Sequence, residues 1–183
     1  MAFPPSLSRL IAKVHTRLPN LVLYSRNIDR EMRSDFQKNI TSVLVFLLEH
    51  LDLRTRNCVH RIDTNLYCTV TISYIAKGSG VSVRTVNRCL SLLSAVGILE
   101  VEEQQIKKAF CGYLVFTGAV RKITDKLFAL YNLLPALQAD RKYKEANRKS
   151  IRFKRCGFIY DIFANRRVPI DRFRSPFLHE EPG

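Results

Sequence analysis

The sequence predicts a mainly helical protein with a small antiparallel β sheet and a basic, helical C-terminal extension. Three observations lead to this fold class. Apolar residues recur at helical spacing in the segments 28–51, 83–96 and 120–137. Segments rich in β-branched and aromatic residues, typical of strands, lie at 98–101 and 110–116. Half of the 30 Lys and Arg residues lie beyond residue 118, accompanied there by only seven acidic residues.

A short helix followed by a longer one is predicted between residues 71 and 96. The apolar residues of the longer helix recur at steps of three and four and share one face: Val83, Val86, Leu90, Leu93 and Gly97, with Cys89 and Val96 beside them. Ser82 is a suitable N-cap, and Gly97 suits the left-handed position after the last helical residue. The shorter helix is expected over 72–76, broken by the Gly-Ser-Gly sequence at 78–80. Together they predict a helix-turn-helix.

A β hairpin, or wing, is predicted immediately after this helix pair. The segment 98–101 suits its first strand and 110–116 its antiparallel partner. The tip between them is expected at 104–108, and a third strand at 66–70 beside the two wing strands. The sequence therefore predicts a winged helix-turn-helix.

The remaining segments suggest three regions along the chain. These are an irregular basic N-terminal arm over 1–27, with a short helix at 7–17; a winged-helix domain over 28–134, opened by an amphipathic helix at 28–51 and a polar loop or basic hairpin at 54–65; and a basic helical extension and tail over 135–183. The last part, 156–183, is aromatic and basic without periodicity, and no role is predicted for it.

The polar face of the longer helix carries two Arg and one Asn and no acidic residue. Arg can bind guanine and Asn can bind adenine through paired hydrogen bonds in the major groove of DNA. Every surface helix has a polar face, so the charges alone would also fit a solvated surface. The predicted DNA contacts are Ser82, Arg84, Thr85, Asn87, Arg88 and Ser91 on the helix and Gln104, Gln105, Lys107 and Lys108 on the wing.

The net charge of +14 and the pI of about 9.9 favour a polyanionic partner. Nucleic acid is the first expectation and an anionic membrane surface the second. Basic residues in the extension are predicted to contact phosphates, the alternative being a solvated charged face: Arg141, Lys142, Lys144, Arg148, Lys149, Arg152, Lys154 and Arg155.

The apolar positions from Val120 to Leu137 form a heptad-like series that Pro135 interrupts. Two interpretations remain open. A helix bearing this series packs back on its own domain, which the short length favours, or it forms a homodimer seam through 120–137.

Several other functions are not supported by the sequence. Five cysteines without paired spacing suit reduced thiols and a cytoplasmic protein, and the spacing of Cys58, His60 and Cys68 matches no zinc finger. Glu100 and Glu102 fit a solvated strand face better than a metal site. No phosphate-binding loop or catalytic constellation is recognisable, and no apolar run approaches a membrane span. We therefore expect no enzyme, no metal, no cofactor and no membrane partner.

The order of the segments is the most specific feature of the chain. It runs REMRSDFQKNITSVLVFLLEHLDL, LYCTVTISYIAKGSGVS, RTVNRCLSLLSAVGILEVEE, FCGYLVFTG and AVRKITDKLFALYNLL. This order, spanning roughly residues 30–154, resembles the RepA-type replication initiators of FII-group plasmids. The helix-turn-helix itself is shared with many bacterial regulators, whereas the flanking order and the segment 119–134 are more distinctive.

The resemblance implies a bacterial, cytoplasmic plasmid protein that binds its origin as double-stranded DNA. It implies recruitment of host replication proteins and control of plasmid copy number, with the recognition helix at 82–96 and the wing at 104–108. No catalytic residue is carried over from the family. A winged-helix transcriptional regulator is the alternative, and an RNA- or ribosome-binding module is a third hypothesis that the lack of an aromatic RNA-binding strand disfavours.

Overall fold

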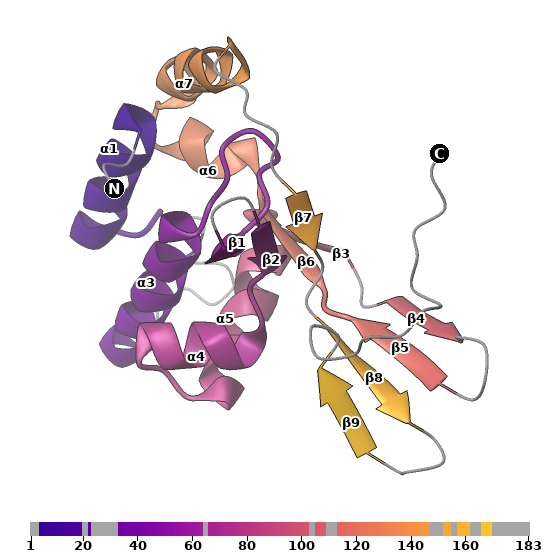
Figure 1. Cartoon of the computed structure of the whole chain (residues 1–183). Coiled ribbons are helices and arrows are strands. Elements are labelled where there is room, and N and C mark those ends of the chain that lie inside the picture. The colour runs from indigo at the N-terminus through magenta and orange to yellow at the C-terminus, as the bar shows by residue number, and fades with distance from the viewer. Residues whose placement is uncertain are drawn as a thin grey trace.

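The structure is a computed structural model that describes residues 4–19, 22, 33–63, 66–102, 105–108, 113–146, 152–154, 157–161 and 166–169. These residues form six helices and nine strands, arranged as a helical body from which a small antiparallel sheet extends (Figure 1). The expected fold class is confirmed at this level, a mainly helical chain with a small antiparallel sheet.

The N-terminal segment contains the short helix expected at 7–17, and this helix is packed into the core, so the described part of the predicted arm is not irregular. Helix α1 (Pro5–Thr16) begins with Pro at its first position, where the missing N–H costs nothing. It buries Leu7, Leu10 and Val14 against α3 and α7. The arm was predicted from its prolines and basic residues, but those stand at the helix ends and on its exposed side.

The predicted long helix is present in its central part as α3 (Ser34–Glu49). Its apolar residues are almost completely buried, including Ile40, Leu44 and Leu47. Helix α3 contacts α1 on one side and the helices α4 (Ile72–Ser79) and α5 (Val83–Ala95) on the other. The predicted start, at residues 28–32, lies outside the described part of the chain.

The helices α4 and α5 are closed by local hydrogen bonds. The side chain of Ser82 accepts from the Thr85 N–H at 3.3 Å, which confirms the predicted N-cap. Gly97 has φ +72°; its N–H donates to the Ser94 carbonyl and the Ile98 N–H donates to the Leu93 carbonyl, both at 2.9 Å. This pair of bonds is a Schellman motif, so the left-handed glycine was also predicted correctly.

Gly78 differs from its predicted role as a helix breaker. Helix α4 continues through residue 78 and ends at Gly80, whose φ is +69°. A Cβ atom at position 78 would lie 1.9 Å from the Phe46 ring. Gly78 therefore allows α4 to approach α3 closely.

One long antiparallel hairpin follows α5. Its inner part pairs β3 (Leu99–Glu102) with β6 (Val120–Ile123), and its outer part pairs β4 (Gln105–Lys108) with β5 (Tyr113–Thr117). The two parts share one register: the last inner pair is Glu102 with Val120, and the first outer pair, three residues further along each strand, is Gln105 with Thr117. A hairpin therefore follows α5, but the predicted pairing of 98–101 with 110–116 is wrong, because 99–102 pairs with 120–123. The predicted tip, at 104–108, is a strand from residue 105 onward.

The C-terminal region adds strands to these sheets, so the helical extension ends with α7 (Leu134–Ala146). Strand β7 (Arg152–Lys154) pairs in parallel with β2 (Leu66–Thr69), which also pairs with β1 (Val59–Asp63). Strand β8 (Gly157–Asp161) lies between β5 and β9 (Arg166–Pro169). These pairings cross the domain boundary expected at residue 135, because short strands reach partners that no local pattern indicates.

The strand at 66–69 does not complete the predicted three-stranded wing sheet. Its neighbours are β1 and β7, and the hairpin instead meets the segment just before β1. There the Cys58 N–H donates to the Arg121 carbonyl at 2.8 Å, and Asn57 bridges to Lys122.

The heptad-like series folds back onto its own chain, which confirms the first of the two interpretations. Val120 and Ile123 lie in β6, and a turn at Asn132 with φ +57° separates α6 (Asp125–Leu130) from α7. Leu127 and Leu137 are fully buried in the core. The proposed dimer seam therefore does not exist as a continuous helix face.

The described residues include three of the five cysteines. Cys58 and Cys89 are buried free thiols, whereas Cys68 is disulfide-bonded. That bond corrects the expectation that all five thiols are reduced.

In the described part of the chain, no helix has the length and apolar character needed to cross a membrane.

Candidate nucleic-acid interface

The polar face of α5 is exposed along its whole length. Arg84, Asn87, Arg88 and Ser91, the residues predicted to face DNA, all have exposed side chains. The opposite face packs into the core through residues such as Val86 and Leu93. The structure therefore leaves the predicted contact face free of the chain's own core.

The first residues of α5 depart from the prediction in two ways. Val83, assigned to the buried face, is 48% exposed at the helix N-terminus. Ser82 and Thr85, predicted to contact DNA, are engaged with each other, because their hydroxyls lie 2.9 Å apart and Ser82 also caps the helix. The available polar face thus begins at Arg84.

Arg88 is held by α3. Its guanidinium lies over the Phe36 ring, 5.1 Å from the ring centre, a cation–π arrangement. That contact directs Arg88 toward α3, whereas Asn87 and Ser91 border the hairpin. The sequence predicted one common face for these residues, but in the structure Arg88 contacts α3, whereas Asn87 and Ser91 lie beside the hairpin.

A groove separates the exposed face of α5 from the hairpin. It has a volume of about 500 Å³ and is lined by Ile72, Asn87, Leu90, Ser91, Ser94, Ala95, Val101 and Arg121. Ser94, Val101 and Arg121 were not predicted as site residues. Only the pairing of β3 with β6, which sets Val101 opposite Arg121, brings them to α5.

Arg121 is the buried cation of this groove. It is 6% exposed, and its Nη1 donates to the Val70 carbonyl at 2.7 Å and to the Ala119 carbonyl at 3.5 Å. Burial lowers the pKa of its guanidinium, while the neighbouring Cys58 acts in the opposite direction. Its Nε is buried without a hydrogen-bond partner among the described residues.

Of the predicted wing contacts, Gln105, Lys107 and Lys108 lie in β4, within the outer hairpin. Gln104 lies outside the described residues. The inner hairpin carries an exposed ion pair between Lys122 and Glu102 on neighbouring strands.

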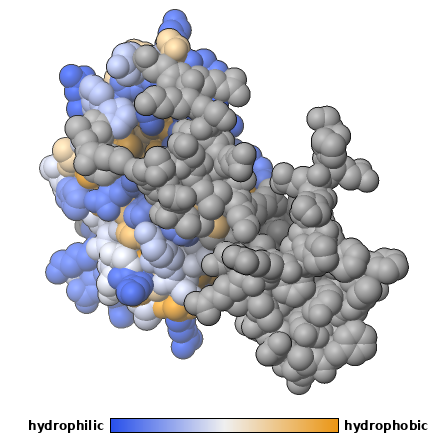
Figure 2. Space-filling view, in the orientation of Figure 1, coloured by the Kyte–Doolittle hydropathy of each residue, from blue (hydrophilic) through white to orange (hydrophobic). Residues whose placement is uncertain are grey.

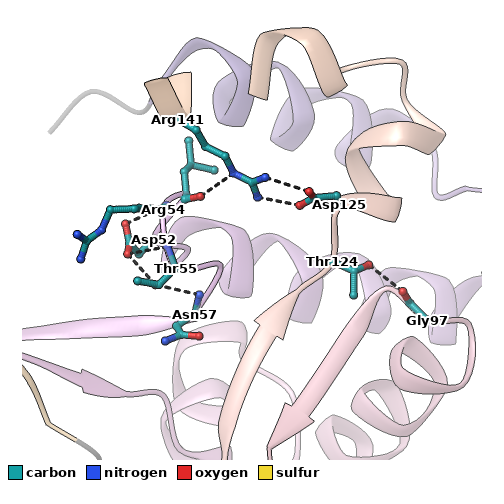
Figure 3. A network of polar contacts seen from close by, with 9 residues as sticks. Asp52, Arg54, Thr55, Asn57, Gly97, Thr124, Asp125 and Arg141 are labelled. Carbon is teal, nitrogen blue, oxygen red and sulfur yellow. Dashed lines mark hydrogen bonds and ion pairs between the residues drawn. The ribbon is translucent and has the colours of Figure 1, made fainter. Parts of the chain in front are cut away.

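The predicted phosphate contacts of the extension fall into different environments. The prediction that Arg141 contacts a phosphate is wrong, because its side chain is engaged within the protein. Its guanidinium makes a bidentate ion pair with Asp125, at 2.9 and 2.7 Å, and its Nε donates to the Leu53 carbonyl at 2.9 Å (Figure 3). The hydrogen bonds from Arg141 hold the pKa of Asp125 below its ordinary value. Lys142 is exposed and Lys144 half-buried.

The other predicted phosphate contacts lie beyond α7. Arg152 and Lys154 belong to β7, where their backbones pair with β2. Arg148, Lys149 and Arg155 lie outside the described residues.

Figure 3 also shows how α6 and α7 are fixed to the body of the protein. The Thr124 hydroxyl donates to the Gly97 carbonyl at 2.8 Å, which ties α6 to the end of α5. The backbone N–H of Ser6 donates to Asp140 at 2.9 Å, which ties α1 to α7. Asp140 and Arg141 in the middle of α7 thus serve packing.

An aromatic and histidine cluster joins α3, β1 and α4. The Tyr74 ring stacks on His60 with centroids 4.7 Å apart, and the Tyr74 hydroxyl lies 3.3 Å from His50 Nε2. Burial, followed by the nearby His50, lowers the pKa of His60. The sequence contained no signal for this cluster, because its members come from three elements.

The described residues contain no group of three His, Cys, Asp or Glu side chains placed to hold a metal ion. Burial raises the pKa of the Cys58 thiol to about 12 and that of Cys89 to about 11. Both thiols are therefore protonated at neutral pH, which makes them poor nucleophiles and poor metal ligands.

Figure 2 shows the helical body from one side, with a largely hydrophilic surface broken by small apolar spots. Comparisons with protein-family models, with curated proteins and with solved structures found no match to this chain.

Proposed function

We propose that this protein is a plasmid replication initiator that binds double-stranded origin DNA sequence-specifically through a winged helix. The observation that carries the proposal is the exposed, acid-free face of α5 beside a protruding hairpin. At ~1.5 Å per residue, the 13 residues of α5 span about 20 Å, a length suited to the major groove.

The packing sharpens the proposed roles of the α5 side chains. Arg84 and Asn87 are the proposed base-contacting residues, because both are exposed and neither is bonded within the described chain. Arg88, held over Phe36, is better placed to contact a phosphate at the edge of the DNA major groove. Ser82 and Thr85 serve the helix cap instead.

The charge of the chain supports the same proposal. A net charge of +14 promotes capture of DNA, and phosphate contacts make that capture sensitive to salt. On α7, Lys142 remains available as a phosphate contact, whereas Arg141 is bound to Asp125.

A binding experiment tests whether α5 contacts DNA bases. In vitro selection from a random duplex library should enrich one sequence, and Asn87→Ala or Arg84→Ala should weaken binding to that sequence by about 10–100-fold, the effect of losing one base contact of ~1–3 kcal/mol. Arg9→Ala removes one exposed charge from α1, on the other side of α3, and should have little effect (Figure 1). Equal weakening by all three variants, or no enrichment, contradicts sequence-specific binding through α5.

A genetic experiment tests initiation. The gene and its flanking DNA are placed on a replicon that cannot replicate in the host alone. Autonomous replication that the Asn87→Ala variant abolishes supports an initiator that recruits host replication proteins. Repression of a reporter without replication favours the alternative, a winged-helix transcriptional regulator.

A further inference from the structure

The groove between α5 and the hairpin is lined by both polar and apolar side chains. Asn87, Ser91 and Ser94 come from the exposed side of α5. Apolar side chains complete the lining: Ile72, Leu90, Ala95 and Val101. A volume of about 500 Å³ lies within the range of small-ligand sites.

Arg121 gives this groove an uncompensated positive charge. Its hydrogen bonds go to two neutral carbonyl groups, and no ion pair joins it to a carboxylate among the described residues. Glu102, which follows the strand partner of Arg121 on β3, pairs with Lys122. Buried charges in proteins are ordinarily paired, because desolvation of an isolated charge costs several kcal/mol.

The carbonyl bonds offset part of that cost, but they engage only one nitrogen of the guanidinium. The Nε group is buried with no acceptor. A guanidinium carries five N–H donors and is suited to carboxylate and phosphate groups. An anion against Arg121 would supply the missing counter-charge.

We propose that this groove binds a small organic anion, a carboxylate or phosphate monoester joined to an apolar body. Arg121 attracts the anionic group, the amide and hydroxyls of Asn87, Ser91 and Ser94 hydrogen-bond it, and Leu90 and Val101 pack on the apolar body. A phosphate of duplex DNA is a poorer fit, since only 6% of the Arg121 surface is exposed and a small anion reaches it more easily than a rigid duplex does.

The site has a consequence for DNA binding that rests on the proposed function. A ligand in the groove covers Asn87 and Ser91, which lie on the face proposed to contact bases. Ligand and DNA therefore exclude each other, and the anion acts as an effector that releases the protein from its site.

Amide NMR shifts of the full-length protein without DNA test the site directly. Phenyl phosphate and benzoate are the probes, and benzyl alcohol is the uncharged control. We expect saturable shifts at Ser91, Ser94 and Ala95 with a Kd of about 1 mM, ordinary for ligands of this size, and at least ten-fold weaker binding of benzyl alcohol. Anions that bind no better than the alcohol, or that shift only amides elsewhere, overturn the proposal.

Two variants separate ligand binding from folding. Arg121→Met should abolish the preference for anions, but it also removes the bonds to Val70 and Ala119. Ser94→Phe fills the groove from an exposed position and should abolish binding with unchanged thermal stability, whereas Ser73→Phe, an exposed α4 position outside the groove, should leave binding intact. Undiminished probe binding by Ser94→Phe refutes the groove as the site.

DNA competition then tests the regulatory consequence. At a probe concentration of ten times its Kd, mutually exclusive binding lowers the apparent DNA affinity by about ten-fold. Groove shifts without any DNA binding retain the anion site and refute the proposed function. Groove shifts with unchanged DNA affinity retain the site and refute the competition.

Discussion

The close approach of α4 to α3 at Gly78 allows a quantitative prediction about stability. In Gly78→Ala the new Cβ would lie 1.9 Å from Cε2 and 2.6 Å from Cζ of Phe46. Carbon atoms in contact are about 3.5–4.0 Å apart, so the ring or the helix must move by roughly 1.5 Å or more. The ring has little room, because Phe46 is 8% exposed and packs on His50 with centroids 4.2 Å apart.

The size of the effect follows from two opposing contributions. Overpacking of this kind costs about 1–3 kcal/mol, and replacing Gly by Ala inside a helix returns up to ~1 kcal/mol. We expect a net loss of about 1–2 kcal/mol, seen as a Tm lowered by roughly 2–8 °C. Circular dichroism melts and urea titrations measure it, and Lys77→Ala, at the preceding exposed position, should change stability by less than ~0.5 kcal/mol.

A double-mutant cycle shows whether the Phe46 ring is the cause. Phe46→Leu removes the ring edge that the new methyl group meets. We expect Phe46→Leu/Gly78→Ala to be at least ~1 kcal/mol more stable than the sum of the two single changes predicts. A Gly78→Ala protein as stable as the parent, or a cycle without coupling, refutes the close-packing argument.

Four further changes test other parts of the structure. Gly97→Ala should lower the free energy of unfolding, measured by urea titration, by about 1–2 kcal/mol, because φ is +72° there. The added Cβ meets nothing closer than 3.5 Å, so no clash adds to this cost, and an unchanged free energy would contradict the left-handed cap. Ser82→Ala should lower the free energy of unfolding by ~1 kcal/mol through the lost N-cap, with base specificity unchanged. Arg141→Met should cost about 1 kcal/mol at pH 7. Because Arg141 depresses the pKa of Asp125, that contribution is present above the ordinary pKa of an aspartate, ~4, and is lost as pH falls through the lowered pKa. The difference in the free energy of unfolding between the two proteins should therefore shrink in acid, and a constant difference excludes the ion pair. Lys142→Gln should reduce the salt slope of DNA binding by about 1, and an unchanged slope removes this residue from the interface.

Local features of the fold were predictable because their causes are local. The cap by Ser82 and the left-handed Gly97 depend on hydrogen bonds among residues within five positions of each other. The buried and exposed faces of α5 follow from helical periodicity, with Val83 as the exception at the first turn, where fewer neighbours cover the helix. The preference for packing the 120–137 series onto its own domain also proved correct.

Non-local pairings were not predictable in the same way. Alternating residues indicate a strand but do not name its partner, and this is why β3 was matched to the wrong segment. The strands β7 and β8 are only three and five residues long, so nothing in their composition indicated that they join β2 and β5. Arg141 looked like its basic neighbours in sequence, and only the turn between α6 and α7 brings it to Asp125.

The sequence by itself determined the helix pair, its caps, the exposed basic and amide face of α5 and the positive charge of the chain. These follow from side-chain periodicity and backbone hydrogen bonds over one or two helical turns. The tertiary structure alone decided which polar side chains remain available, because ion pairs, cation–π contacts and strand registers join distant residues. It also created the groove beside α5, where Val101 and Arg121 from the hairpin meet Asn87 and Ser91.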